Sequence, residues 1–433
     1  MLNWRYIFRL FQAFFSKFKL IIAIATIAGV LIFVAISLLL PAFLNNKTER
    51  IGLTGRYIAQ TLPLDILSQV SDGLTKINLN GDVEPNLASS WQTPDKGKTW
   101  AFTLKDDIKW QDGTKITSDT VNYQFSDLVT EKPDRKTLVF KLQNPHSPFP
   151  KVVSKPIFKK GLLGTGEWRV KKIKLSAGVV SSLLLTNSEK KQKIYKFYPT
   201  EERTKLAFKL GWVDKVSDLY TSQPFDLWEK IHIDTTSNTG QYVAIFFNTQ
   251  DANLSDKTTR QALAYGIDKN ALSDKRAISP ISIDSWAYNP QVKLYSFDKE
   301  KAKKDIKEGL AINLSTSAVL LPLAEKISKN WEDIGIKVNI QVFSAIPSDY
   351  QALLAIFDIP LDPDQYTFWH STQTNTNVTK YSSPRIDKLL EDGRTELNLE
   401  ERKKIYIDFQ RFLVEDSPAI FLYYPTTYTI SRN

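Results

Sequence analysis

The chain has 433 residues, of which 42% are hydrophobic and 24% are charged, so it has the composition of a globular protein with room for two or three domains. Its net charge is +10, and no long basic run or basic-aromatic pattern accompanies that charge, which argues against a nucleic-acid partner. Cysteine is absent, which excludes disulfides, thiolate zinc sites, a cysteine nucleophile and an anchor on a lipid-modified cysteine. The three histidines are far apart and none stands in a metal-ligand spacing, so we predict no metal and no cofactor.

An apolar run of 21 residues, Leu20 to Leu40, lies near the N-terminus and contains no charged side chain. At ~1.5 Å per residue, a helix of this length spans a hydrocarbon core of ~30 Å. A cleaved signal peptide usually has a shorter apolar stretch and a small-residue cleavage site, and neither is found here. The sequence therefore predicts a retained transmembrane helix over residues 20–44, with a cleaved signal as the alternative.

The charges beside this run predict its orientation. Four basic residues precede it, whereas the charges that follow it nearly balance. Basic residues stay on the cytoplasmic side, so we place residues 1–19 in the cytoplasm and residues 45–433 outside. Aromatic residues at helical spacing within residues 1–19 predict a short interfacial helix that leads into the span. The expected protein is a single-pass protein of the cell membrane.

The first part of the exported region alternates strand and helix signals. Residues 99–104 and 138–142 place apolar side chains at every second position, which predicts two strands. The pair Asp112-Gly113 predicts a tight turn. Residues 118–128 carry an apolar stripe at helical spacing, which predicts a helix between the two strands.

The second part is predicted as α/β. A strand over residues 312–319, a helical stripe over 323–334 and a strand over 338–342 form a βαβ unit, which implies parallel pairing. A later helix is predicted to begin at a capping box formed by Asn398 and Glu401. This region contains no second apolar span and no detectable repeat.

No catalytic signature is found in the sequence. The G-x-S-x-G elbow, the H-E-x-x-H zinc motif and the phosphate-binding G-x-x-x-x-G-K-[ST] loop are all absent. Aspartate and glutamate are abundant, and two carboxylates can act as acid and base, but nothing in the sequence selects a pair. We therefore predict a protein that is not an enzyme and has no catalytic residue. An anchored carboxylate-dependent hydrolase remains the alternative.

Short stretches along residues 51–433 form an ordered series with consistent spacing: Ser71–Leu74, Gly81–Ala88 with Trp91, Lys98–Lys105, Trp110–Thr114, Ser118–Val121, Gly164–Trp168, Phe247–Thr249, Arg260–Asp268, Tyr381–Leu390 and Glu400–Tyr424. Taken together, this series resembles bacterial extracellular solute-binding proteins of the oligopeptide and dipeptide class, family 5. Most of these residues are of the types that serve turns, helix caps and core packing. The resemblance therefore identifies the scaffold more directly than it identifies the binding site.

The resemblance implies an α/β protein with a bilobed, periplasmic-binding-protein-like (type II) fold that closes on its ligand like a clamp. Lobe I would hold residues 51–240, lobe II residues 241–415, and residues 416–433 would return to lobe I. The chain would cross between the lobes at 241–248 and at 415–418. It further implies a monomer that binds a small ligand, with a peptide expected first, and works with the permease subunits of an ABC-type importer. A non-transport chaperone or sensor on the same scaffold is the other alternative.

The segment from 358 to 377 is the expected binding site. It follows a predicted strand over residues 353–357, and ligand sites of α/β proteins lie beyond the carboxyl ends of such strands. Peptide-binding members of the family hold the ligand's amino group with an aspartate, and Asp358 lies near that place but out of register. Asp358 or Asp364 is expected to pair with the ammonium group of the ligand. Tyr366 and Trp369 are expected to stack on the ligand. His370 and Asn375 are expected to form hydrogen bonds with it. The other interpretation is an exposed turn whose aromatic side chains fill the core beneath it.

Overall fold

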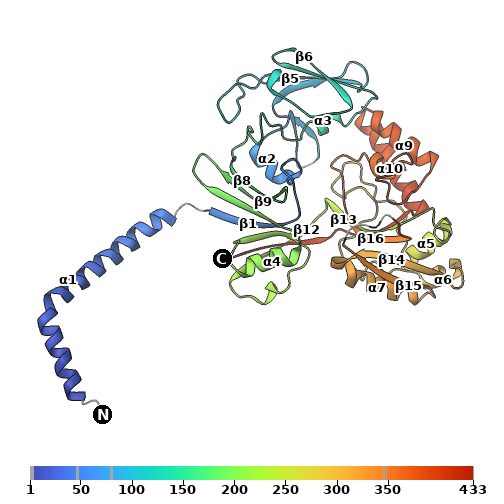
Figure 1. Cartoon of the computed structure of the whole chain (residues 1–433). Helices are drawn as coiled ribbons and strands as arrows, with labels where there is room; N and C mark the ends of the chain where they lie inside the picture. The colour runs from blue at the N-terminus through green and yellow to red at the C-terminus, as the bar shows by residue number, and fades with distance from the viewer. Residues whose placement is uncertain (1–3, 45–47, 79–80, 345–346, 348, 433) are drawn as a thin grey trace.

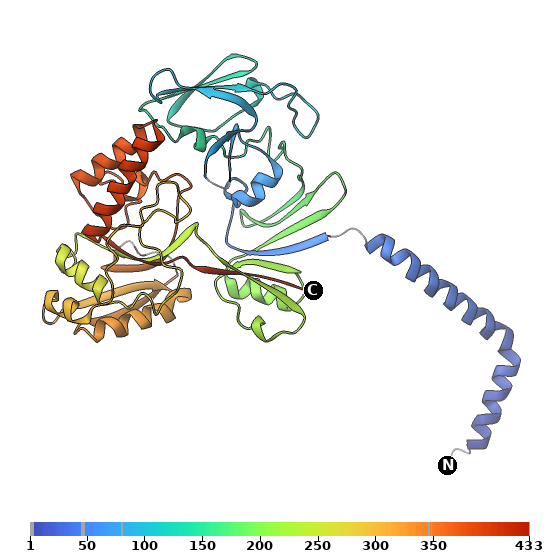
Figure 2. The ribbon, with the colours of Figure 1, turned by 180° about the vertical axis from the view of Figure 1, so that it is seen from behind.

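The computed structural model describes residues 4–44, 48–78, 81–344, 347 and 349–432. Helix α1 (Trp4–Leu44) projects away from the rest of the protein (Figures 1 and 2). Its segment Phe14–Val34 contains no buried residue and is long and apolar enough to cross a membrane. A signal sequence would meet the same two criteria. The interfacial helix and the span that the sequence predicts as separate pieces form one continuous helix.

A seven-stranded mixed sheet contains the first strand and the last strand of the chain. Its strand order is β12-β18-β11-β1-β10-β9-β8, and β1 runs parallel to both of its neighbours. Helix α4 packs on the sheet, while α2 lies between it and the next sheet (Figure 1). The elements of this part are β1 (Thr48–Thr54), η1 (Ala59–Thr61), α2 (Leu64–Val70), β8 (Arg169–Ser176), β9 (Val179–Thr186), β10 (Gln192–Tyr198), α4 (Glu201–Lys209), β11 (Lys215–Leu219), η3 (Phe225–Leu227), β12 (Ile231–Ser237) and β18 (Thr426–Arg432).

A four-stranded antiparallel sheet, in the order β4-β5-β7-β6, forms a separate small unit (top of Figure 1). The alternation predicted for residues 99–104 and 138–142 is confirmed, because Trp100, Phe102 and Phe140 are buried in one core. The elements are β2 (Thr75–Ile77), β3 (Val83–Pro85), β4 (Ala88–Gln92), β5 (Thr99–Leu104), η2 (Ser118–Thr120), β6 (Leu128–Asp134), β7 (Thr137–Leu142) and α3 (Phe149–Val152).

The helix predicted over residues 118–128 is wrong. A single 3₁₀ turn forms at 118–120, and the chain then runs without helix to β6. Phe125 instead packs its ring 5.9 Å from the rings of both Phe140 and Phe149. Ser, Asp and Asn residues, together with Thr120 and Val121, give this stretch a weak helix propensity, and the aromatic packing overrides that weak preference.

A five-stranded sheet in the order β15-β14-β16-β13-β17 organises the other half of the protein. The predicted βαβ unit is confirmed, because β14 and β15 pair in parallel and α7 connects them. The elements are β13 (Gln241–Phe247), α5 (Lys257–Tyr265), α6 (Lys299–Asp305), β14 (Ala311–Ser317), η4 (Ala318–Leu320), α7 (Leu321–Glu332), β15 (Lys337–Phe343), β16 (Ala352–Asp358), α8 (Tyr366–Trp369), α9 (Pro384–Thr395), α10 (Leu399–Asp416) and β17 (Ala419–Tyr423).

The packing of α7 shows how the apolar stripe holds this half together. Ile327 and Trp331 are completely buried, and Trp331 Nε1 donates a hydrogen bond to the Leu263 carbonyl at 3.1 Å. Burying one large apolar side chain stabilises a fold by about 1.5–3 kcal/mol. Gly335 follows the helix with φ of 92°, a left-handed conformation that ends helices and that glycine adopts without steric cost.

The start of α10 agrees with the prediction in one of its two parts. The Asn398 side chain accepts hydrogen bonds from the backbone N–H groups of Glu400 and Glu401, so it is the predicted N-cap. A capping box also needs a hydrogen bond from the Asn398 N–H to the Glu401 side chain. Here the Asn398 N–H donates to the Glu396 side chain instead.

The chain passes twice between the seven-stranded and five-stranded sheets. Strands β13 and β17 pair with each other inside the five-stranded sheet, so the passages lie at 238–240 and 424–425. The resemblance implies a return to lobe I over residues 416–433, but β17 pairs with β13 in the five-stranded sheet, and β18 is the strand that joins the seven-stranded sheet. We propose lobe limits that follow this pairing: residues 241–423 are called the second lobe, and residues 48–240 with 424–432 the first lobe.

Candidate functional site

A cleft of about 660 Å³ lies between the small four-stranded unit of the first lobe and the C-terminal helices of the second lobe. This volume is within the range of about 300–1,000 Å³ that is usual for small-molecule sites. The wall from the first lobe is mainly apolar and includes Phe125, Leu128, Leu142, Pro145, Phe149 and Val152. The opposite wall is polar and consists of Tyr366, Glu391, Arg394 and Thr395.

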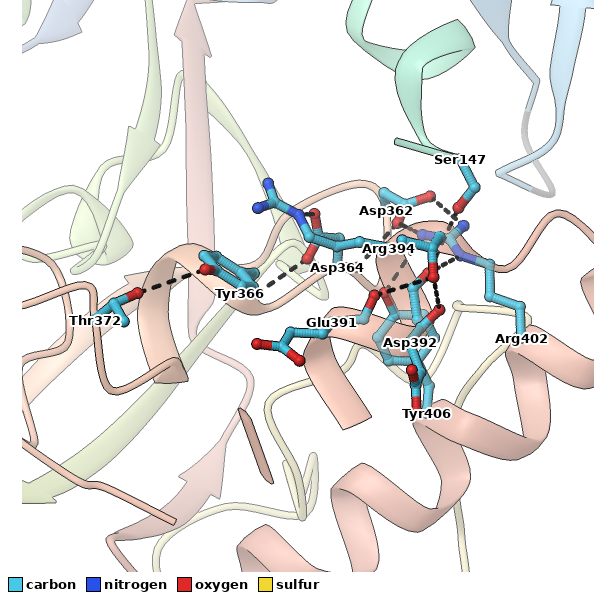
Figure 3. Close-up of polar contacts among 12 residues, drawn as sticks. Ser147, Asp362, Asp364, Tyr366, Thr372, Glu391, Asp392, Arg394, Arg402 and Tyr406 are labelled. Atoms are coloured by element: carbon cyan, nitrogen blue, oxygen red, sulfur yellow. Dashed lines mark hydrogen bonds and ion pairs between the residues drawn. The ribbon is translucent and has the colours of Figure 1, made fainter. Parts of the chain in front are cut away.

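Arg394 is held in this wall by two residues of the segment that the sequence singled out (Figure 3). Its Nε donates a hydrogen bond to an Asp364 carboxylate oxygen at 2.9 Å, and its guanidinium lies 4.2 Å from the centre of the Tyr366 ring. The other Asp364 oxygen accepts a hydrogen bond from the backbone N–H of Tyr366 at 3.0 Å. Within the part of the chain that the structure describes, the two terminal nitrogens of Arg394 have no hydrogen-bond partner.

This arrangement suits the recognition of an anion. The Arg394 side chain is 31% exposed, so its fixed charge stays accessible from the cleft. A guanidinium with two free donors matches a carboxylate or a phosphate, and charge-assisted bonds of this kind are stronger than neutral ones. Asp364 is nearly buried and already paired, so in this arrangement it positions Arg394.

A second group of charges links the two lobes beside the cleft. The Asp362 carboxylate accepts a hydrogen bond from Arg402 at 3.0 Å and lies 3.5 Å from Lys151 Nζ, which comes from the first lobe (Figure 3 shows the Asp362–Arg402 contact). Burial alone would raise the pKa of Asp362, but the charge of Arg402 and its hydrogen bonds lower the pKa below its ordinary value. The backbone N–H of Ser147 donates to the Arg394 carbonyl at 2.6 Å. The lobes therefore touch through charged and backbone groups next to the cleft.

His146 also lines the cleft, on the side of the first lobe. Burial lowers its pKa to about 4, although the nearby charge of Asp364 acts in the opposite direction. The imidazole is consequently neutral at pH 7. A neutral imidazole contributes one donor and one acceptor to the cleft without repelling the charge of Arg394.

Asp358 lies at a different place, at the exposed end of β16, where the two lobes meet. Its carboxylate accepts a hydrogen bond at 2.7 Å from Gln241, which in turn accepts one at 3.1 Å from the Tyr220 hydroxyl of the first lobe. Burial raises the pKa of Tyr57 in the first lobe, and the charges of Asp218 and Asp358 raise it further. Carboxylates of both lobes therefore lie close to the same phenol.

The other predicted site residues are not in the cleft wall. Trp369 is 2% exposed and packs in the core of the second lobe, and His370 is buried next to it. His370 Nδ1 lies 2.8 Å from the Thr372 hydroxyl, and its ring stacks on Tyr366 with 4.1 Å between the ring centres. Asn375 is exposed on the surface. Their roles as ligand contacts stay predictions, since contact with Trp369 or His370 would require a rearrangement of the core.

Of the described residues that line the cleft, Tyr366 was predicted from the sequence, and the ones that were missed include His146, Glu391 and Arg394. Glu391 and Arg394 are on α9, where they read as ordinary solvent-exposed residues of an amphipathic helix. No local signal distinguishes them, because their role depends on a cleft wall that is more than 200 residues away. Among the described residues, no three His, Asp or Glu side chains are grouped so that they would hold a metal ion.

The comparisons with known proteins agree with this architecture. The sequence model described as "Bacterial extracellular solute-binding proteins, family 5 Middle" matches residues 82–378, which is more than half of the chain. The probable D,D-dipeptide-binding periplasmic protein DdpA of Escherichia coli is 22% identical over 417 residues, which cover 79% of each chain.

Two solved structures are similar in fold. NikZ of Campylobacter jejuni in complex with Ni(L-His) has a TM-score of 0.74 and 23% identity, covering 90% of this chain and 94% of NikZ. The ABC transporter-associated periplasmic binding protein DppA of Helicobacter pylori, in complex with the peptide STSA, has a TM-score of 0.70 and 18% identity, covering 90% of this chain and 95% of DppA. The predicted α/β fold of the periplasmic-binding-protein kind is thereby confirmed.

Proposed function

Because the chain belongs to family 5 of the bacterial extracellular solute-binding proteins, we propose that it captures a small solute, a peptide first of all, and delivers it to an ABC-type importer. The observation that carries this proposal is the cleft of about 660 Å³ whose walls come from both lobes. A ligand that contacts both walls stabilises the closed arrangement of the lobes by its own binding free energy. Relatives with the same fold are described with a dipeptide, a nickel–histidine complex or a short peptide, so the scaffold accommodates several classes of ligand.

The charges beside the lobe junction favour a zwitterionic ligand. Arg394 offers its two terminal nitrogens to the carboxylate of a peptide in the cleft. Asp358 and Asp218 lie outside the cleft wall, and they offer carboxylates to the ammonium group of a ligand that extends from the cleft to the lobe junction. Each ligand charge that loses water on closure requires such a partner. Side chains of the peptide would lie against the apolar wall that includes Phe125 and Phe149.

We further propose that α1 remains attached and holds the binding domain on the outer surface of the cell membrane as a monomer. The apolar segment and the basic residues before it support this orientation. Binding without turnover follows from the same family relationship, so the proposed protein has no catalytic residue.

The test is the identification of the ligand and of its anionic anchor. Full-length protein is purified in nanodiscs, and bound molecules are released and identified by mass spectrometry. The released ligand, or a defined library of di- to pentapeptides, is then titrated while the melting temperature is measured, because a ligand that binds only the native state raises it. We expect Arg394→Gln to weaken binding at least tenfold, which is about 1.4 kcal/mol.

Arg385→Gln is the matched control, since Arg385 is exposed on the same helix α9 and does not line the cleft. Equal affinities of the two variants would remove Arg394 from the site. A peptide library that moves neither the melting temperature nor the tryptophan fluorescence would refute peptide capture and favour a chaperone or a sensor. Cleavage of the labelled peptides by the purified protein would instead favour the hydrolase.

A further inference from the structure

Five large apolar side chains are exposed on one region of the first lobe. They are Leu206 (49% exposed), Leu210 (54%), Trp212 (53%), Leu227 (87%) and Trp228 (38%), and we call this set the tether-side patch. Single exposed apolar residues are ordinary on protein surfaces, whereas a gathered group marks a contact with a partner or a membrane.

Ring contacts connect the two parts of the patch. Phe208 lies on α4 between Leu206 and Leu210, and its ring centre is 5.1 Å from that of Phe225 and 6.4 Å from that of Trp228. The end of α4 and the turn at 225–228 are therefore neighbours through the buried Phe208 ring, and both segments carry exposed members of the patch.

The patch lies at the end of the seven-stranded sheet where β1 begins. Asp214, two residues after Trp212, donates its backbone N–H to the Arg50 carbonyl at 2.8 Å and accepts a hydrogen bond from Arg50 Nε at 2.8 Å. The Arg432 N–H donates to the Asp214 carbonyl at 3.0 Å, and Arg432 pairs with Ile231, which follows Trp228 closely. Figures 1 and 2 show the C-terminus and α4 on the side from which α1 departs.

The chain length between α1 and β1 restricts where this end of the lobe can be. Helix α1 ends at Leu44 and β1 begins at Thr48, and the four steps between their Cα atoms reach at most about 14 Å. No charged residue occurs between Leu20 and Leu44, so the apolar span extends close to the end of α1. If α1 spans the membrane, the start of β1 cannot leave the membrane surface, and the neighbouring patch is held against it.

The chemistry of the patch fits a phospholipid surface. Tryptophan is enriched at membrane–water interfaces, where its apolar ring and its N–H group both find partners, and leucine supplies apolar area. Lys209 and Lys230 flank the patch, and Lys190 and Lys191 lie in the β9–β10 turn at the same end of the sheet. Asp226 and Glu229 offset part of this charge, so we expect the apolar side chains to dominate and anionic lipid to contribute less.

We propose that the tether-side patch is a second membrane contact, with Leu210, Trp212 and Leu227 inserted among the lipid headgroups of the leaflet from which α1 emerges. This inference rests on the proposed anchoring by α1. Its consequence is mechanical: the first lobe is fixed on the membrane at two points, and the second lobe is the part that moves when the cleft opens.

The absence of cysteine allows a direct test, because single cysteines can be introduced and labelled without removing native ones. Full-length Leu210→Cys and Leu227→Cys are labelled with the environment-sensitive fluorophore NBD and reconstituted in vesicles of phosphatidylethanolamine and phosphatidylglycerol. Leu399→Cys, an exposed leucine at the start of α10 in the second lobe, is the matched control. We expect brominated lipid to quench the two patch labels at least about threefold more strongly than the control.

Equal quenching at all three positions, in protein that resists alkaline extraction from the vesicles, would overturn the membrane contact while leaving the anchor in place. Loss of the protein on alkaline extraction would overturn both the anchor and the contact. A blue-shifted emission that persists in detergent and is insensitive to brominated lipid would show that another protein covers the patch, and would also overturn the proposal.

Discussion

Replacing Asp362 by asparagine should destabilise the protein strongly, because the change removes a charge and keeps the size of the side chain. The Asp362 and Arg402 side chains are only 11% and 7% exposed. After Asp362→Asn, the Arg402 guanidinium stays buried without its carboxylate, and breaking a buried ion pair in this way costs about 3–5 kcal/mol. At about 2–4 °C per kcal/mol for domains of 150–250 residues, the melting temperature should fall by about 6–20 °C.

The assay is thermal unfolding of the full-length protein, followed by circular dichroism at pH 7. Asp358→Asn is the matched control, since Asp358 is exposed and accepts one hydrogen bond from Gln241. A surface change of this kind usually alters stability by less than about 0.5 kcal/mol. Equal melting temperatures of the two variants would contradict a stabilising ion pair between Asp362 and Arg402.

The effect of Asp362→Asn should also depend on pH. The pKa of Asp362 is lowered in the folded protein, so its contribution is complete above its unfolded pKa of about 3.9 and is lost as the pH falls below that value. The difference between the wild type and Asp362→Asn should therefore shrink between pH 5 and pH 2. A difference that stays constant over this range would show that Asp362 acts through its shape and not through its charge.

Three further predictions follow from the burial of individual groups and from the proposed orientation. Burial lowers the pKa of His146 to about 4, whereas the unfolded chain takes up a proton near pH 6.5. Stability should therefore fall as the pH decreases between these values, and His146→Gln should flatten that slope in a pH series of melting temperatures. Trp369→Ala should lower the free energy of unfolding by about 3–5 kcal/mol, measured by chemical unfolding, because the side chain is buried in the core. Trp212→Ala, at an exposed position, should lower it only slightly. Equal losses in the two variants would favour a ligand-contact role for Trp369. Protease added to intact cells should digest the chain after Asn45 and leave a membrane stub, and full protection until lysis would reverse the proposed orientation.

The sequence by itself predicted the features that depend on near neighbours along the chain. The βαβ unit from β14 to β15 follows from apolar side chains spaced at two and at 3.6 residues, and these spacings need no information about distant contacts. The N-cap at Asn398 and the apolar segment of α1 are likewise contained in a few consecutive residues. The family is predicted from many short stretches in a fixed order, each of which is weak evidence when taken alone.

Tertiary structure decided the features that depend on how distant segments meet. Residues 118–128 carry a helical stripe, but packing between Phe125 and the rings of Phe140 and Phe149 replaced the helix. The cleft joins a wall near Phe149 to Arg394 on α9, and no local pattern encodes a contact across that separation. From the sequence, Trp369 is compatible with a stacking surface for the ligand and with a core residue. The packing of α8 in the core of the second lobe buries it. Burial depends on how the layers assemble and not on the residue type alone.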